Sequence, residues 1–594
     1  MPLSQLTEPL GRKRAAHLLR RACFGGTKAE IDEFALLTPQ EAIEWLFQED
    51  LPDPTPPIDP ETGVEWITTG NVNEDNADTL MRYFLDWTLG LMTGATAQED
   101  TRLSEILRER IVLFLHTHFT TKRSVVRDSR SLYYQQALFR FYAFDKNDKI
   151  IPGDPLEEIP DEIIPKNFKE LTLKVSIDNA MLRFLDGYLN VKGRPNENYA
   201  RELLELYSIG KGLEGIEKVP QEDGDYIHFT EQDVQAGARV LSGFDIDDSY
   251  TTIDEDTGIP RGNIKGNGTI AQQHDNGDKT FSFRFENTTI APSTELLSGG
   301  RATEESVIDE IRQMINMIYD QRETAQHICR RLYRFFVYHD VSEAVENAIV
   351  KDLADVFVAN DFKIQPVLEA LFTSTYFYDG VPGSDDDMFG SLIKSPVDLA
   401  IGMVRSFELP FPNYLTESVA FYELMDGILG DIIDMGMDYY EPFEVAGYSA
   451  YFQFPIFNRA WISTNYLTNR YQFIRSRINP ATGIDAERIN VYDYIRNTFD
   501  LSVYSDGRQL ITTLISYFFP LSDNLEFVED SNGDITNERL SYFLQEFLFK
   551  EGLSDTGEDA WTALWEEDNP GARASERLSF LFNALLQSPE FQLM

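Results

Sequence analysis

Cysteine is almost absent from this chain of 594 residues, which has only two, Cys23 and Cys329. Two thiols form at most one disulfide, and they cannot hold a zinc ion or an iron–sulfur cluster through several thiolates. Long hydrophobic runs are missing as well, because no stretch approaches the roughly 18 uncharged apolar residues that cross a bilayer. Residues 1–21 lack the apolar core of a signal peptide. We therefore expect no transmembrane segment and, by default, a cytoplasmic location.

Basic residues are scarce too. The chain has 52 Lys and Arg against 99 Asp and Glu, a formal net charge of −47. Such a field repels phosphate backbones and anionic lipid, so we expect no nucleic-acid partner. The sequence also lacks a Gly-x-Ser-x-Gly elbow, a Walker loop, a dinucleotide fingerprint and a His-Glu-x-x-His helix. The sequence therefore gives no motif that indicates a common hydrolase or a nucleotide-binding enzyme.

Apolar residues, by contrast, are as frequent as in ordinary globular proteins. They make up 42% of the chain, charged residues make up 25%, and 41 Phe and 27 Tyr supply a large area for burial. The length exceeds what one hydrophobic core usually organises. The composition therefore predicts a folded protein of two or more packed modules.

Hydrophobic periodicity predicts a mainly α fold. Apolar residues recur at helical spacing over 12–22, 79–91, 102–118, 130–144, 168–189, 196–209, 230–241, 304–319, 324–338, 342–377 and 394–404. Thr38 and Thr230 have the spacing of helix N-caps, each with an acidic residue three positions later. Residues 244–292 alternate and turn as hairpins do, which predicts one small β-rich insert.

These patterns divide the chain into five predicted modules. They are an N-terminal helical module at 1–243, the β-rich insert at 244–300, a middle helical module at 301–410, an aromatic-rich irregular segment at 411–480 and a C-terminal helical module at 481–594. Residues 145–165 read as a surface excursion and residues 380–387 as a linker. The aromatic side chains between 439 and 471 fit either a loop that fills the core or a binding surface.

Several motifs, in order along the chain, resemble a bacterial family called domain of unknown function 1800. They include Ala15 to Arg21 with Phe24-Gly25, Pro195 to Leu206, Thr230 to Val234, His274-Asp275 with Gly277 and Lys279, Lys394-Ser395-Pro396, Trp461-Ile462 with Arg470, and Ser588 to Gln592. The resemblance spans nearly the whole chain. It implies no mechanism, but it implies a protein partner, with a member of another uncharacterised family, domain of unknown function 1501, as the candidate. It also implies an exported or envelope-associated role.

The motif at 196–206 separates polar from apolar residues on a helical wheel. One arc of the predicted helix carries the polar side chains Glu197, Asn198, Arg201, Glu202 and Glu205. This pattern fits a surface helix in which Arg201 pairs with acids four residues away on either side. It also fits the wall of a cleft, with Arg201 as a catalytic candidate and Asn196, Glu197 and Asn198 as substrate-binding candidates.

A divalent metal site is the second interpretation of the same helix. Glu202 and Glu205, three residues apart, can reach one ion. The remaining ligands would come from His118, at the end of a long apolar helix, and from His274. A metal-dependent hydrolase or oxidase would use this set.

The turn from His274 to Lys279 offers a different chemistry. His274 and Asp275 can bind a metal or transfer a proton near neutral pH, which makes both catalytic candidates, and Lys279 is a candidate for substrate binding. The alternative is an Asx turn between two strands. The turn at 530–534 is a poor calcium loop, because Ile535 and Ser541 stand where glycine and glutamate belong.

Two further candidates lie in the aromatic segment. Trp461 and Arg470 can form a stacking platform for a sugar or a peptide, or they can pack in the core. His17, His228, His327 and His339 are expected to have structural roles, at helix ends or beside carboxylates.

Two classes of function remain open at this point. The first is a non-enzymatic scaffold or partner protein that acts with a companion at or beyond the cell envelope. The second is the metal-dependent enzyme.

Overall fold

The computed structural model describes residues 3–69, 77–153, 161–379, 390–478, 488–529, 531, 533–553, 555–567 and 570–594. Over these residues the fold is mainly helical, with four small two-stranded antiparallel sheets, which confirms the predicted fold class. The predicted linker at 380–387 lies outside the described residues, as do Asp530 and Asn532 of the acidic turn. No described helix has the length and apolar character needed to span a membrane.

The helices of the first part gather around α5, which contacts α1, α3, α4, α7 and α13. Their bounds are α1 (Gly11–Cys23), α2 (Lys28–Phe34), α3 (Pro39–Leu46), α4 (Ala77–Thr93), α5 (Arg102–His118), α6 (Arg123–Val126), α7 (Ser129–Ala143), α8 (Phe168–Val175), α9 (Asn179–Phe184), α10 (Asn198–Glu202) and α11 (Glu231–Val240). Helix α5 is buried on all sides from Ser104 to His118. A helix with this environment is the centre of a helical body.

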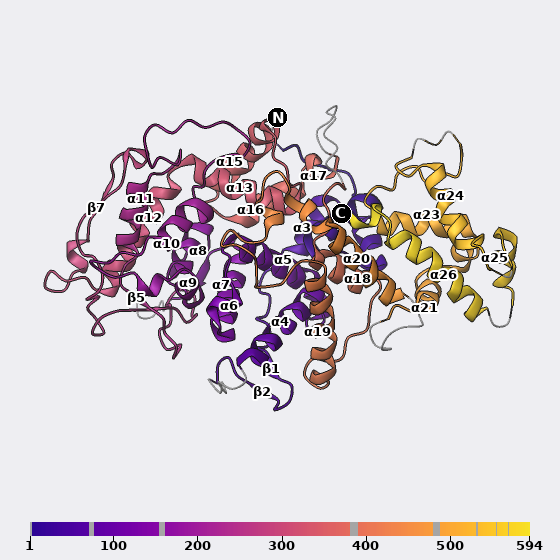
Figure 1. The fold of residues 1–594 in the computed structure, drawn as a ribbon, viewed down its shortest axis with the longest axis horizontal. Helices are drawn as coiled ribbons and strands as arrows, with labels where there is room; N and C mark the ends of the chain where they lie inside the picture. Colours follow the sequence, from indigo (N-terminus) through magenta and orange to yellow (C-terminus); the bar gives the residue numbers. More distant parts are fainter. Residues whose placement is uncertain are drawn as a thin grey trace.

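The later helices extend this body in two directions. Those of the middle part are α12 (Glu304–Tyr319), α13 (Arg322–Phe336), α14 (Glu343–Val345), α15 (Lys351–Ala359), α16 (Ile364–Phe372), α17 (Thr375–Asp379) and α18 (Pro396–Ser406). Those that follow are α19 (Ser418–Asp434), α20 (Thr464–Ile478), α21 (Val491–Thr498), α22 (Leu501–Tyr504), α23 (Gly507–Phe518), α24 (Asn537–Leu548), α25 (Glu558–Leu564) and α26 (Gly571–Leu586). Figure 1 shows an elongated molecule, with α11, α12 and the insert at one end and α21 to α26 at the other.

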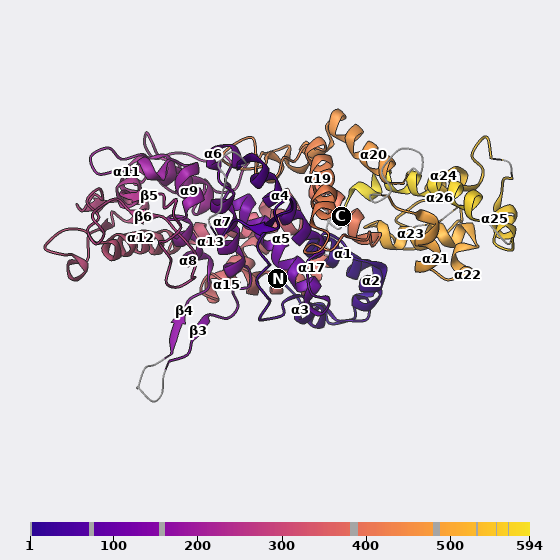
Figure 2. The same cartoon turned by 90° about the horizontal axis from the view of Figure 1, so that it is seen from below.

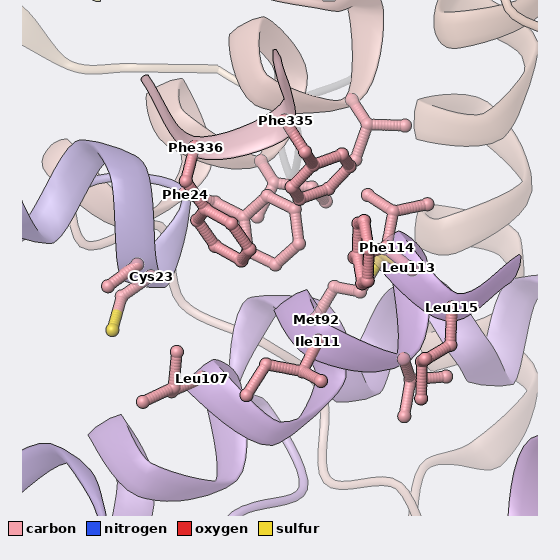
Figure 3. Packing of buried hydrophobic residues seen from close by; sticks show 14 of the residues in the cluster. Cys23, Phe24, Met92, Leu107, Ile111, Leu113, Phe114, Leu115, Phe335 and Phe336 are labelled. Atoms are coloured by element: carbon pink, nitrogen blue, oxygen red, sulfur yellow. The ribbon is translucent and has the colours of Figure 1, made fainter. Parts of the chain in front are cut away.

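The core at the middle of the molecule joins helices that are far apart in sequence. Figure 3 shows Phe24 at the end of α1, Ile111 and Phe114 of α5, and Phe335 and Phe336 of α13 packed together. The rings of Phe114 and Phe335 have centroids 5.5 Å apart at a steep angle, as aromatic pairs prefer. This packing fixes the first third of the chain against the middle part.

The β structure is not confined to one insert, which corrects the prediction. The strands are β1 (Ile58–Asp59) with β2 (Val64–Glu65), β3 (Lys149–Ile151) with β4 (Glu162–Ile164), β5 (Phe244–Asp245) with β6 (Asn263–Ile264), and β7 (Lys279–Thr280) with β8 (Thr289–Ile290). The first two pairs precede the insert. Ile150 lies opposite Ile163 in the β3–β4 hairpin. This part of the excursion at 145–165 therefore forms strands, although its Pro, Asp and Glu content did not predict them. Figure 2 shows that hairpin standing out from the body.

Three predicted helices are interrupted. The one expected over 342–377 is divided into α14 to α17, with a break between Ala359 and Ile364. The helix expected over 168–189 stops at Val175, because the side chain of Asp178 accepts the backbone N–H of Met181 at 2.9 Å and begins α9. The helix expected over 196–209 is α-helical only through Glu202 and continues as the π-helical turn η4 (Leu203–Tyr207). A π turn shifts the register, so the wheel drawn for a regular α-helix fails beyond Leu203.

The aromatic segment is partly in the core and partly exposed, and its use as a binding surface stays a prediction. Tyr439, Tyr440 and Trp461 are buried, whereas the side chain of Phe443 is 85% exposed and that of Phe454 is 48% exposed.

The boundaries of the five modules stay a prediction. The ends of the chain meet, however, because α1 packs on α23 and Arg21 donates a hydrogen bond to the carbonyl of Met594.

Candidate functional site

Three polar side chains from the insert and α12 form a closed cluster, which we call the buried triad: His274, Lys279 and Glu310. The Lys279 ammonium donates directly to the carboxylate of Glu310. His274 Nε2 lies 3.4 Å from Lys279 Nζ and 3.4 Å from Glu310 Oε2. On the other side of the ring, His274 Nδ1 lies 2.8 Å from the carbonyl oxygen of Ser242, which makes Nδ1 the protonated nitrogen and leaves Nε2 to accept from Lys279.

The buried triad is cut off from solvent. The side chains of all three residues are 0% exposed. Desolvation lowers the pKa of Lys279, and the charge and hydrogen bond of Glu310 oppose this shift without cancelling it. Glu310 Oε1 has no hydrogen-bond partner among the described residues. A closed ion pair of this kind ties β7 to α12 rather than presenting a reactive group.

Sequence reasoning found His274 and Lys279 but missed Glu310. The signal was present in α12, where Val307, Ile311 and Met314 form the buried face and Glu310 lies on it. An acid on the apolar face of a helix needs a buried partner. This requirement indicated that Glu310 would pair with a buried cation.

Asp275 turns away from the triad. Its carboxylate accepts from Arg239 Nε at 2.8 Å and from the backbone N–H of Gly277 at 3.1 Å. Partial desolvation acts to raise the pKa of Asp275, but the Arg239 and Gly277 hydrogen bonds outweigh it and the pKa is lowered. The contact with Gly277 closes an Asx turn, the structural alternative for this motif.

Arg201 is held by acids on two helices. Its guanidinium donates to Glu231 at 2.7 and 3.1 Å, a bidentate pair with the first turn of α11, and lies 3.6 Å from Glu197. Asn196 accepts from the backbone N–H of Asn198 at 3.0 Å, so it shapes the start of α10. The structure therefore uses this motif to join α10 to α11.

The two metal-ligand candidates on this helix sit next to each other. Glu205 pairs with Lys211 at 2.5 Å. Partial burial, reinforced by the charge of Glu205, raises the pKa of Glu202 to about 7. Across the described residues, however, no group of three or more His, Cys, Asp and Glu can hold a metal ion. The structure does not bring His118, Glu202, Glu205 and His274 together as one ligand set.

His118 has a structural contact at the end of the π turn. His118 Nε2 lies 3.0 Å from the carbonyl oxygen of Tyr207, and His327 Nε2 lies 3.0 Å from that of Leu206. Burial lowers the pKa of both imidazoles, that of His327 to about 3, so each is neutral and donates one N–H. Carbonyls at a helix end need such donors, and the expected structural role of His327 agrees with this contact.

Trp461 and Arg470 lie in the core. Trp461 is 4% exposed and Arg470 is 0% exposed. Arg470 donates to the side-chain oxygen of Gln592 at 2.8 Å and to the carbonyl of Lys394 at 2.9 Å. Arg470 Nη1 has no hydrogen-bond partner among the described residues, but burial closes the guanidinium to solvent. The structure therefore places the pair in the packing between α20 and the end of the chain.

Comparison with protein families matches residues 17–593 to the model described as "Protein of unknown function (DUF1800)". The chain belongs to the DUF1800 family. The match confirms the resemblance inferred from the motifs. No curated protein and no solved structure matches this DUF1800 chain significantly.

Proposed function

We propose that this DUF1800 chain is a non-enzymatic scaffold that binds a companion protein. The observation that carries the proposal is the use of the motif residues inside the fold. His274 and Lys279 close the buried triad, and Arg201 joins α10 to α11. These motif residues make contacts that hold helices and strands together inside the protein. Such residues fix the shape of the protein, and a scaffold needs a fixed shape.

An exposed apolar patch supports this proposal and gives the companion a place to bind. We define the scaffold patch as Ile216, Val219, Phe454 and Ile456. The ring of Phe454 lies against the turn at Gly215, where an added Cβ would be 3.1 Å from its Cζ. Val219 is 79% exposed, and Phe454 and Ile456 are 48% and 47% exposed. The contact of Phe454 with Gly215 brings the two segments together, and Ile216, Val219 and Ile456 lie within four residues of these two in the chain. We propose that their exposed apolar side chains form one interaction site.

The charge around the scaffold patch specifies its partner. Glu217, Glu222 and Asp223 are exposed in the loop that carries Val219, and the whole chain has a net charge of −47. We therefore propose a companion whose docking surface has an apolar centre and a basic rim. The family resemblance implies a member of the domain of unknown function 1501 family, acting with this chain at or beyond the cell envelope.

The test titrates the purified chain with the domain of unknown function 1501 protein encoded in the same genome and measures affinity by calorimetry. We expect the double variant Val219→Ser, Ile456→Ser to weaken binding by at least about ten-fold, since each side chain loses buried apolar area. The control is Leu36→Ser, Val125→Ser, at positions with the same exposures of 79% and 47%. Equal effects of both variants, or no complex with the unmodified chain, would overturn the proposal.

Elemental analysis addresses the metal-dependent enzyme directly. That alternative would need His118, His274, Glu202 and Glu205 around one ion, and the described residues contain no such group. Stoichiometric iron, zinc or manganese in the purified chain, lost in a folded Glu202→Ala variant, would replace the scaffold proposal with the enzyme.

A further inference from the structure

A cleft of about 650 Å³ opens beside the base of the β3–β4 hairpin. Its walls come from the segment after α3, from α5 and α7, from Lys149 and Ile150 of β3, and from the turn at 257–260 of the insert. Figure 2 shows the hairpin rising from this side of the body. None of the motif residues discussed above lines the cleft. It is therefore a separate feature, of the volume that small-molecule sites have.

The lining of the cleft is less acidic than the protein as a whole. Five basic and four acidic side chains line it, although the chain as a whole has 52 basic and 99 acidic residues. Lys149 and Lys166 lie 5.4 and 5.3 Å from the centroid of the Phe141 ring. Lys149 Nζ donates to the carbonyl of Asp256 at 3.0 Å, and Lys166 Nζ donates to that of Phe144 at 2.6 Å. Each ammonium has three donors, so both retain donors for a ligand.

A third cation lies deeper in the cleft. Arg108 is 5% exposed and donates to the carbonyl of Pro52 at 2.8 Å, but its Nε has no hydrogen-bond partner among the described residues. The nearest carboxylate, Glu109, is 3.6 Å away and already accepts two hydrogen bonds at 2.8 Å from Arg140. This Nε is closed off from solvent, so Arg108 adds positive charge beside the cleft rather than a donor that a ligand can reach.

The rest of the lining includes aromatic side chains and hydrogen-bond acceptors. Phe47, Tyr133, Tyr134, Phe141 and Phe144 line the cleft. Burial raises the pKa of Tyr133 to about 12, which keeps its phenol protonated as a donor. Asp53, Asp50 and Glu49 supply carboxylate oxygens at the rim. Aromatic faces next to both donors and acceptors suit a ligand with apolar C–H faces and many hydroxyl groups.

We infer that this cleft binds a short acidic carbohydrate, an oligosaccharide of uronic acid residues. One ring carboxylate accepts from Lys149 and Lys166, the sugar faces pack on Phe141 and Tyr133, and the hydroxyl groups donate to the acidic rim. A phosphate ester would place two charges on one group near Asp53 and Asp50, whereas an oligouronate carries one charge on each ring. A neutral sugar would make no charge-assisted hydrogen bond with Lys149 or Lys166.

The experiment measures binding of trigalacturonate to the full chain by calorimetry at neutral pH and low salt. Maltotriose, a neutral trisaccharide, and inorganic phosphate are the comparison ligands. We expect trigalacturonate to bind at least about ten-fold more tightly than either. The variant Lys149→Gln should lose about ten-fold in affinity, because it removes one charge-assisted hydrogen bond. Lys192→Gln, the same change at an exposed position outside the cleft, should leave affinity unchanged.

Lys149 is a suitable probe because, among the described residues, its ammonium donates only to a backbone carbonyl, so removal of the charge should not unfold the chain. Failure of trigalacturonate to bind would overturn the inference, and so would equal affinity for maltotriose or an equal effect of the two lysine variants. Tighter binding of phosphate would replace the carbohydrate with an inorganic anion. None of these results depends on the companion protein, so the scaffold proposal is tested separately.

Discussion

The carboxyl group of Asp86 on α4 should make the stability of this protein fall as the pH rises. Its side chain is 1% exposed and its Oδ1 has no hydrogen-bond partner among the described residues. The nearest cation is Arg82, 3.8 Å away, and that guanidinium binds Asp426 of α19. Desolvation, together with the charge of Asp426, raises the pKa of Asp86 to about 8. Tyr83 and Tyr422 face the same carboxyl from the two helices.

The magnitude follows from linkage. The unfolded chain releases the Asp86 proton near pH 3.9, whereas the folded chain keeps it until about pH 8. Between these values the unfolded state binds fewer protons, so the free energy of unfolding decreases as the pH rises through this window. At about 1.36 kcal/mol per pH unit, the loss is about 1.5 kcal/mol at pH 5 and about 4 kcal/mol at pH 7.

The substitution Asp86→Asn removes the titration and keeps the shape of the side chain. We expect the variant to be more stable than the unmodified chain by up to about 4 kcal/mol at pH 7 and by less than about 2 kcal/mol at pH 5. Urea unfolding followed by circular dichroism at several pH values measures the difference. Asp78→Asn, at an exposed position of the same helix, should change stability by less than about 1 kcal/mol. A gain for Asp86→Asn that is the same at every pH would refute the reasoning.

The other expectations concern the buried triad and the thiols. Lys279→Met or Glu310→Leu alone should each cost about 3–5 kcal/mol, because each leaves one buried charge without its partner. The double variant should recover much of that loss in urea unfolding, and simple additivity would show that the two residues do not act as a pair. Cys23 and Cys329 should react with a thiol reagent only after unfolding, because burial raises the pKa of both, that of Cys23 to about 12. Rapid labelling of the native chain would contradict their placement in the core.

Local patterns in the sequence predicted most of the helices, because those patterns act within one element. Thr38 and Thr230 form capping boxes, each with an acid three residues on, and α5 and α12 have the predicted bounds. The π turn after Glu202 was not predictable in this way. The carbonyls of Leu206 and Tyr207 at its end accept hydrogen bonds from the imidazoles of His327 and His118 on other helices. The sequence of the π turn itself gives no sign of these distant donors.

The candidate site was harder to predict for the same reason. His274 and Lys279 are close in sequence, but the acid that joins them is 31 residues beyond Lys279 on another helix. The cleft is more dispersed still, since its walls range from Phe47 to Gln365. Composition even pointed away from it, because a net charge of −47 gives no sign of a local group of cations.

Buried arginines explain how an acidic chain keeps its distant parts in a fixed arrangement. Arg110 of α5 pairs with Asp398 of α18, and its guanidinium lies 4.7 Å from the ring centroid of Phe24. Arg20 of α1 donates to the carbonyls of Tyr517 and Phe519 at 2.8 and 3.1 Å. Apolar side chains in place of a buried ion pair often give equal or greater stability, so such pairs are better explained by specificity than by stability. We propose that in this protein they specify which helices meet, and a fixed arrangement of helices is what the proposed scaffold requires.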